Sequence, residues 1–380
     1  MKNTITKLMI TVKIIAVLAG CSITAPEPET ANSIFLVSWN VQALFDGEDN
    51  GKEYAEYRAS SGWTEEKYRA RITGIADAVK TLGDSDDITE HKNKVPDIIA
   101  FIEIENEKIM EDIASAANYH RTFFASSPGA ALGLGLVSRF PILNTKTHSA
   151  HFEGTETPRP VAEIWVDAGG RTLVLMVCHW KSKLGGDRET EAARKAEAAI
   201  IARRLSEIQA TDAGIPVIVM GDLNENADEF TRTAYLCALM PDSEEAAECI
   251  REAGSRPGFQ DFLVISGKRP PRTEYLGGVD AATVLYSPWT EETGSGSYYY
   301  NEQWETIDHF LFNGAAFDKS GWDFAGFRAA EDYPFIDEND LPNAYVPWTG
   351  NGLSDHLPLL SWLALQQPPG SNQLVNAESP

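Results

Sequence analysis

The sequence is poor in cysteine and in basic residues, and these shortages exclude several classes of protein. It has four cysteines in 380 residues, and no Cys/His cluster has the spacing of a structural zinc site. No serine stands in a nucleophile-elbow motif, so hydrolysis by a serine nucleophile is not indicated. The 32 lysines and arginines face 56 acidic residues, which gives a formal charge of −24. Such a surface repels polyanions at long range and offers no general basic footprint for DNA, although it does not exclude a small basic patch beside a metal site.

The N-terminus has the layout of an export signal. Lys2, Lys7 and Lys13 surround an apolar run at 14–20 that is too short to span a bilayer stably. Residues 18–21 resemble the lipobox of bacterial lipoproteins, whose cysteine is acylated. We therefore expect a lipoprotein signal peptide at 1–20 and a lipid on Cys21, which would hold the protein on the periplasmic or cell-surface side of a membrane. The alternatives are an ordinary cleaved signal and an N-terminal anchor, each with a chance cysteine.

The remaining chain is predicted to form one domain. Its composition, 43% hydrophobic and 23% charged, is globular, and no repeat or linker divides it. We expect a flexible tether at 21–33, the domain at 34–365, an unpacked tail at 366–380, and a monomer. Cys178 is expected to be a buried thiol, whereas Cys237 and Cys249 could form a disulfide that the sequence does not decide.

The stretch 215–226 is the most informative of the chain. A run of β-branched residues predicts a strand that is buried on both faces and ends at Gly221, and Asp222 and Asn224 follow at once. Residues two apart on an extended chain point to the same side, so these two side chains can converge on one ligand. Taken alone, the pattern is better described as a strand followed by an Asx-type turn, and the rest of the chain changes that interpretation.

Several other apolar strands also end in polar residues. Strands are predicted at 34–40, 96–103, 134–142, 159–166 (with one solvated face), 173–178, 298–300, 306–312 and from 354 onward. One helix is expected after an N-cap at Thr64, and a second at 189–209 with its packing face at Ala192, Ala196, Ala199 and Ile200. Alternating strands and helices predict sheets with flanking helices. Residues 227–295 have the least clear pattern of secondary structure in the chain.

The polar strand ends together suit one chemistry. They are Asn40, Glu103, His179, Asp222, Asn224, Asp308, Asp355 and His356. A polar group beside the core is costly unless it is paired or functional, and eight such groups are hard to explain as capping. Mg²⁺ prefers oxygen ligands, which Asn40, Glu103 and Asp355 would supply. A second carboxylate can orient the attacking water, and imidazole and amide groups can stabilise the charge of the transition state. Together these groups suit the hydrolysis of a phosphate ester.

The same motifs, in order, resemble those of the endonuclease/exonuclease/phosphatase superfamily, which includes DNase I, exonuclease III, bacterial sphingomyelinase and inositol polyphosphate 5-phosphatases. They are residues 39–42, 96–103, 179–182, 221–224, 307–309 and 354–356. The resemblance runs from about residue 34 to residue 362. It implies a four-layer α/β sandwich: two mixed sheets packed face to face, with helices on both outer faces.

The resemblance also implies a role for each position. Glu103 looks like the principal Mg²⁺ ligand (Mn²⁺ or Ca²⁺ being possible), with Asn40 and Asp355 beside it. Asp222 resembles the residue that orients or deprotonates water, and Asn224 would bind the phosphate. His356, held by Asp308, would contact the scissile phosphate or act as an acid or base. His179 matches a histidine of the DNase I and sphingomyelinase branches, and Arg159 a phosphate-binding arginine.

Two departures from the family pattern and three functions have to be weighed. Gln42 stands where the exonuclease III branch has an aspartate, which argues against a second metal ligand there. Glu105, two residues past Glu103, could substitute for that ligand or be solvated, and we favour the solvated position. The tyrosine run 298–300 could stack on bases, but such a run in a strand more often belongs to a core or an edge. The first hypothesis is an exported, lipid-anchored endonuclease acting on nucleic acid. The alternatives are a phosphatase or sphingomyelinase-like hydrolase of phospholipid or inositol phosphate head groups, and a non-catalytic surface binding protein.

Overall fold

The computed structural model describes residues 32–83, 94–152, 155–157, 159–235, 237–253, 260–291 and 294–366. The predicted signal peptide, the acylation site Cys21, the tether up to residue 31 and the tail from residue 367 lie outside these residues. Among the helices in the described ranges, none combines the length and the apolar character that a membrane crossing requires.

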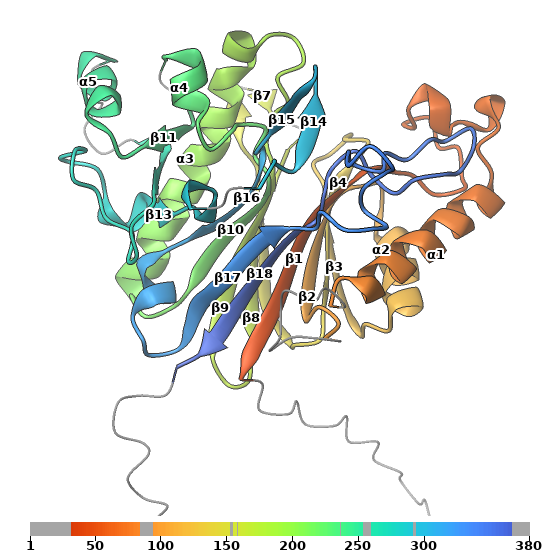
Figure 1. The fold of residues 1–380 in the computed structure, drawn as a ribbon, viewed down its shortest axis with the longest axis horizontal. Coiled ribbons are helices and arrows are strands. Elements are labelled where there is room, and N and C mark those ends of the chain that lie inside the picture. The colour runs from red at the N-terminus through yellow and green to blue at the C-terminus, as the bar shows by residue number, and fades with distance from the viewer. Residues whose placement is uncertain are drawn as a thin grey trace, which may run out of the picture.

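Two mixed sheets form the centre of the molecule (Figure 1). The six-stranded sheet has the order β17 (Trp322–Ala329), β18 (Leu359–Leu365), β1 (Ser33–Leu44), β2 (Ile98–Ile104), β4 (Gly133–Ser138), β3 (Arg121–Ala125). The eight-stranded sheet has the order β11 (Leu239–Pro241), β12 (Leu263–Ser266), β13 (Val284–Tyr286), β16 (Asp308–Phe312), β10 (Val217–Asp222), β9 (Thr172–His179), β8 (Val161–Asp167), β5 (Ile142–His148). Two small hairpins stand apart from them, β6–β7 (His151–Phe152 and Thr155–Glu156) and β14–β15 (Tyr298–Tyr300 and Gln303–Glu305).

Helices cover the outer faces of both sheets (Figure 1). On the six-stranded sheet lie α1 (Glu65–Thr81) and α2 (Glu107–Ala117); on the side of the eight-stranded sheet lie α3 (Asp187–Thr211), α4 (Glu229–Thr233) and α5 (Glu244–Ala253). Short 3-10 helices occupy Ala55–Tyr57, Ala59–Ser61, Ala281–Thr283, Pro288–Thr290 and Gly314–Phe317. The predicted N-cap of α1 is confirmed, because the Thr64 side chain accepts a hydrogen bond from the backbone of Lys67.

The continuous apolar strands are explained by burial on both faces. On β9, Leu173, Leu175 and Val177 belong to the core between the sheets. The alternate residues Val174, Met176 and Cys178 belong to a second core that includes apolar residues of α3. Each strand therefore separates two apolar layers, and a sequence with no alternation follows from that position. The expected four-layer sandwich is confirmed.

The expected solvated face of one strand was wrong, and the expected packing face of one helix was confirmed only in part. The strand predicted at 159–166 is buried on both faces, and Glu163 on β8 is 0% exposed because α3 covers it. On α3 itself, Ile200 of the expected packing face is buried, whereas Ala192, Ala196 and Ala199 are only partly buried. The deeply buried side of the helix includes charged residues, Arg194 and Glu197, whose partners lie in loops at the strand ends.

The arrangement of strands gathers the polar strand ends at one end of the sandwich. β1 and β2 run parallel, as do β9 and β10, so their carboxyl ends lie together in each sheet. β16 and β18 run antiparallel to these strands, so their amino ends lie at the same place. In register, Asp222 is next to His179 on one side and Asp308 on the other.

The region 227–295 extends the eight-stranded sheet, with α4 and α5 beside it. Cys237 lies in the apolar cluster of this region, and Cys249 is on α5. Both are free thiols, so the disulfide considered from the sequence is not formed.

Candidate active site

Glu103 is placed by a break in regular strand geometry. The pairing of β2 with both neighbours shifts register at this residue, and its φ of 70° lies in the left-handed region. Gln42 and Ala43 on the facing part of β1 also have positive φ, 53° and 51°. Ala43 N–H donates to Glu103 Oε2 at 2.7 Å. Strained backbone of this kind costs about 1–3 kcal/mol per residue and commonly occurs where a side chain must be re-aimed.

Asp222 is the meeting point of the two sheets. Asn40 Nδ2, from the six-stranded sheet, donates to Asp222 Oδ2 at 3.1 Å. His179 Nε2 lies 3.6 Å from both Glu103 Oε1 and Asp222 Oδ2. The other oxygen of Asp222 accepts the backbone N–H of Asn224 at 2.9 Å. The predicted residues Asn40, Glu103, His179 and Asp222 therefore form one cluster.

Asp308 and His356 form a second pair beside this cluster. His356 Nδ1 lies 2.8 Å from Asp308 Oδ2, which leaves Nε2 as the nitrogen available to a ligand. Ser297 Oγ donates to the same oxygen of Asp308 at 2.7 Å. Asp222, Asp308 and His356 each offer an atom within 4.8 Å of the others. The second pair thus opens onto the same site as the first.

Burial and crowding of charge shift several pKa values. Burial, and then the charge of Asp308, raise the pKa of Asp222 to about 7. Burial, together with the charge of Glu103, also raises the pKa of Asp355, although His356 opposes this. Burial lowers the pKa of His356, but the ion pair with Asp308 outweighs it and raises the pKa to about 10. The site therefore holds an imidazolium beside carboxylates whose negative charges repel each other.

Arg159 and Asn224 complete the polar lining. The Arg159 guanidinium contacts His179 Nδ1. Because an arginine donates, that nitrogen accepts, and the ring proton of a neutral His179 lies on Nε2, which faces Glu103 and Asp222. Burial, and then the charge of Arg159, lower the pKa of His179 well below its usual value, which favours this neutral form. Asn224 Nδ2 donates to the carbonyl of Trp180 at 3.1 Å, which orients its amide beside the loop that follows β9.

Gln42 has a structural partner that the sequence did not reveal. Its Oε1 accepts the backbone N–H groups of Tyr345 at 2.7 Å and of Asp355 at 3.1 Å. Its Nε2 donates to the carbonyl of Tyr345 at 3.2 Å. The side chain is therefore occupied in holding the segment that carries Asp355.

Glu105 is not solvated, contrary to expectation. It is 8% exposed and accepts hydrogen bonds from Asp46 N–H at 2.9 Å and Asn50 Nδ2 at 2.6 Å. Burial raises its pKa to about 7. Its role is to organise the loop after β1, because both donors lie in that loop.

Sequence reasoning also missed supporting residues. Ser354 Oγ donates to the carbonyl of Asn40 at 2.6 Å, and the Trp39 indole donates to the carbonyl of His356 at 3.0 Å. The Tyr298 ring stacks on His356 with centroids 4.5 Å apart. Trp39 and Ser354 stand inside the recognised motifs, so proximity in sequence was the only signal for them.

The donor set fits a hard divalent cation. The carboxylate of Glu103 lies near enough to Asp222 and Asp355 for its charge to act on both, and carboxylate ligands of this kind suit Mg²⁺, Mn²⁺ or Ca²⁺. The Asn40 amide turns its nitrogen to Asp222, and its oxygen accepts the backbone N–H of Gln42 at 3.0 Å. Asp308 Oδ1 is buried and has no hydrogen-bond partner among the described residues. A cation would reduce the repulsion that raises the pKa values of Asp222 and Asp355.

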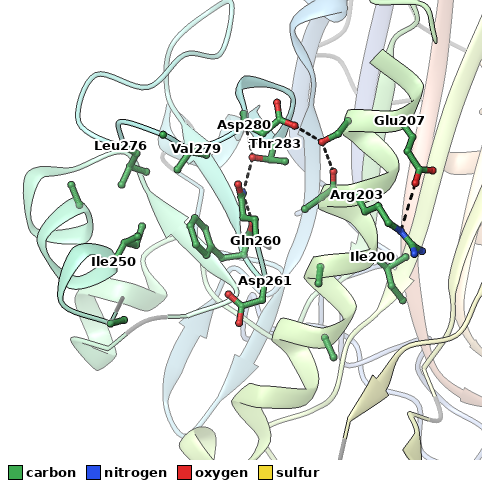
Figure 2. A pocket seen from close by; sticks show the side chains of 18 of the residues that line it. Ile200, Arg203, Glu207, Ile250, Gln260, Asp261, Leu276, Val279, Asp280 and Thr283 are labelled. Carbon is green, nitrogen blue, oxygen red and sulfur yellow. Dashed lines mark hydrogen bonds and ion pairs between the residues drawn. The ribbon is translucent and has the colours of Figure 1, made fainter. Parts of the chain in front are cut away.

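A cavity of about 1260 Å³ lies elsewhere, between α3, α5 and the segment 275–283 (Figure 2). Figure 2 shows apolar side chains such as Ile200, Ile250 and Leu276 together with charged ones such as Arg203 and Glu207. None of the described residues that line it belongs to the carboxylate and histidine cluster, so this cavity is separate from the candidate active site.

Comparison with known proteins finds a matching sequence family and similar folds. The profile described as the endonuclease/exonuclease/phosphatase family matches residues 35–251. The structure of D. rerio TDP2 complexed with single strand DNA product is 14% identical, with a TM-score of 0.51 over 88% of this chain and 99% of that chain. A humanized D. rerio TDP2 is 13% identical, with the same TM-score and coverage. TDP2 from C. elegans is 15% identical, with a TM-score of 0.49 over 87% of this chain and 75% of that chain. No curated protein matches the sequence significantly. At these identities the D. rerio structures establish a shared fold.

Proposed function

This chain belongs to the endonuclease/exonuclease/phosphatase family, whose enzymes are divalent-metal-dependent phosphoester hydrolases, and from that premise we propose that it is a Mg²⁺-dependent phosphodiesterase acting on nucleic acid. The observation that carries the proposal is the convergence of Asn40, Glu103, His179 and Asp222 with the Asp308–His356 pair at one end of the sandwich. Against a binding protein without turnover, every expected catalytic position carries a side chain that is competent for the reaction.

Each residue has a chemical task that follows from its surroundings. Glu103, with Asn40 and Asp355, would hold the cation, which supplies positive charge to the phosphate oxygens when it is bound. Asp222 is suited to accept a proton from the attacking water, because its pKa is near neutral. The Nε2 of His356 is suited to donate a proton or a hydrogen bond to a substrate oxygen, because Asp308 holds the other nitrogen.

The remaining groups would bind the phosphate. Arg159 lies at the site through its contact with His179 and carries positive charge, and the Asn224 amide lies on the loop after β10. Both meet the negative charge that grows on the phosphate oxygens as water attacks. We further propose that the protein is exported and anchored through Cys21, which the lipobox-like stretch supports.

Phospholipid head groups are a second candidate substrate. Leu184, 85% exposed, lies on the loop after β9, and Trp348, 74% exposed, lies on the segment before Asp355. Large apolar side chains on loops that adjoin a hydrolytic site could contact a bilayer surface. Hydrolysis of vesicles and of nucleic acid therefore have to be compared directly.

The first experiment measures hydrolysis of plasmid DNA, of bis-p-nitrophenyl phosphate and of phosphatidylcholine vesicles by the purified protein, in Mg²⁺ or EDTA. We expect DNA cleavage that requires the cation. Asp222→Asn should lower kcat by about 10²- to 10⁴-fold, the range for losing a general base. Asp77→Asn, at an exposed position on α1, is the matched control and should leave kcat unchanged. Folded protein that hydrolyses none of the three esters would contradict the proposal, and cleavage of vesicles alone would select the second candidate.

A further inference from the structure

The hairpin β14–β15 adds aromatic rings to the candidate active site. Tyr298 pairs with His356 through a β-bridge and stacks on its ring, with centroids 4.5 Å apart and planes 26° apart. Tyr300 stacks in turn on Tyr298, with centroids 6.1 Å apart and planes 13° apart. The rings of His356, Tyr298 and Tyr300 thus form a ladder of nearly parallel planes that leads outward from the site.

The outer end of this ladder is uncovered. Tyr300 is 54% exposed, whereas Tyr298 is half-buried. Alternation along the strand turns Tyr299 to the other face, where it meets Trp304 at 5.4 Å. The core or edge role considered for the tyrosine run therefore accounts for Tyr298 and Tyr299 but leaves the exposed ring of Tyr300 unexplained.

We propose that Tyr300 stacks on a nucleobase of the substrate while the phosphodiester to be cleaved lies at His356. This inference rests on the proposed function and names the feature of the substrate that is recognised: a flat base beyond the one next to the cleaved phosphate, because the Tyr298 ring lies between His356 and Tyr300. Stacking on an aromatic side chain tolerates any base, since every base has a π-face. Tyr300 is thus a specificity-determining residue that selects nucleotide esters over phosphate esters that lack a flat aromatic ring.

The surroundings of the hairpin favour a base over a lipid surface. Its tip is formed by Asn301 and Glu302, and Glu305 follows on β15. Hairpins and helices that enter the bilayer interface present apolar or basic side chains, not acidic ones. Stacking also suits a protein with a formal charge of −24, because it supplies affinity that does not depend on a basic groove.

The test compares full-chain wild type, Tyr300→Ala and Tyr300→Phe on oligonucleotides with normal and with abasic positions, in Mg²⁺. Oligothymidylate and oligouridylate are run in parallel to distinguish DNA from RNA. The ratio of kcat/KM on the normal strand to that on the abasic strand should fall by about 5- to 150-fold in Tyr300→Ala, the range for losing one base–aromatic stack. Tyr300→Phe should keep the wild-type ratio, because it keeps the ring.

Tyr275→Ala is the matched control, since Tyr275 is 50% exposed but lies in the separate cavity, and it should keep the wild-type ratio. Binding of an oligonucleotide that contains 2-aminopurine is measured in EDTA as a readout independent of turnover. Wild type should quench its fluorescence and Tyr300→Ala should not. An unchanged ratio and equal quenching in Tyr300→Ala would overturn the inference, as would a loss confined to phosphatidylcholine vesicles. A wild type that quenches the probe without cleaving any ester would contradict the proposed hydrolase but support the stack.

Discussion

At the scale of single residues, Glu163 is a buried charge outside the site with partners on three elements. It accepts hydrogen bonds from Arg204 on α3 at 2.6 Å and 2.9 Å, from His148 on β5 at 2.8 Å, and from the Trp165 indole at 2.7 Å. The Lys146 ammonium lies 3.7 Å away. Burial alone raises its pKa, but hydrogen bonds from His148 and Arg204 outweigh burial and hold the pKa well below the usual 4.5.

Glu163→Gln should destabilise the protein in a pH-dependent way. A carboxylate whose pKa is lowered by folding stabilises the folded state fully above its unfolded pKa, near 4.5, and loses that effect as the pH falls further. We expect a loss of about 2–3 kcal/mol in unfolding free energy at pH 7, because a charged hydrogen-bond partner of a mostly buried arginine is removed. The difference from wild type should shrink between pH 4.5 and pH 3, as measured by urea unfolding.

Glu65→Gln is the control for this prediction. Glu65 pairs with Arg69 on the surface of α1, and its side chain is 54% exposed. Surface pairs of this kind contribute about 0–1 kcal/mol, so both the stability and its pH dependence should stay close to wild type. A constant difference between Glu163→Gln and wild type across the whole pH range would show that folding does not lower the pKa of Glu163, and would contradict this prediction.

At the scale of elements, the end of β1 and the segment before β18 are joined by Gln42. The Gln42 carboxamide hydrogen-bonds two backbone N–H groups and one carbonyl of this segment. Gln42 and Tyr345 are 303 residues apart in the sequence. These hydrogen bonds place Asp355 beside Glu103 on β2 and Asp222 on β10. The position of a proposed cation ligand therefore depends on a residue that itself touches no substrate.

Gln42→Ala should loosen this segment and slow hydrolysis. We expect faster amide hydrogen exchange at Tyr345 and Asp355, whose N–H groups lose their acceptor, and a fall in kcat of about 10- to 100-fold, the size of effect that a misplacement of about 1 Å can cause. Glu338→Ala, at an exposed position of the same segment, should change neither. Faster exchange with normal kcat would mean that Asp355 is not required for the reaction.

At the scale of the whole molecule, the acidic charge is concentrated where a cation would bind. The charges of Glu103 and Asp308 contribute to the raised pKa values of Asp222 and Asp355, in a chain with a formal charge of −24. The two sheets meet at this point through Asn40 and Asp222. An ion that binds here would therefore stabilise the contact between both halves of the fold.

Mg²⁺ should raise the melting temperature above that in EDTA. At a concentration of about 100 times Kd, binding to the folded state alone contributes about 2.7 kcal/mol. For a domain of about 330 residues, whose entropy of unfolding is about 0.7 kcal/mol/K, that corresponds to roughly 4 °C in a thermal scan. Glu103→Gln should reduce the shift strongly, whereas Asp212→Asn, at an exposed position after α3, should preserve it. Identical melting in Mg²⁺ and EDTA would contradict a cation site in this cluster.

Much of the architecture could be predicted because its signals are local. The strands that lead to Asn40, Glu103, His179 and Asp222 are runs of apolar residues, and their polar ends stand next to them in the sequence. The N-cap at Thr64 depends on a residue three positions away. These features, and the motif order that indicates the family, follow from neighbours along the chain.

The sequence by itself therefore determined the fold class and the identity of the polar cluster, whereas only the tertiary structure decided how that cluster is held. The left-handed backbone at Glu103, the partners of Gln42 and the burial of Glu163 depend on segments that are distant in sequence. The ladder from His356 to Tyr300 depends on a hairpin that lies more than 50 positions from the histidine. Propensity and periodicity describe a residue's own strand or helix, but these contacts arise only when two sheets and their loops pack against each other.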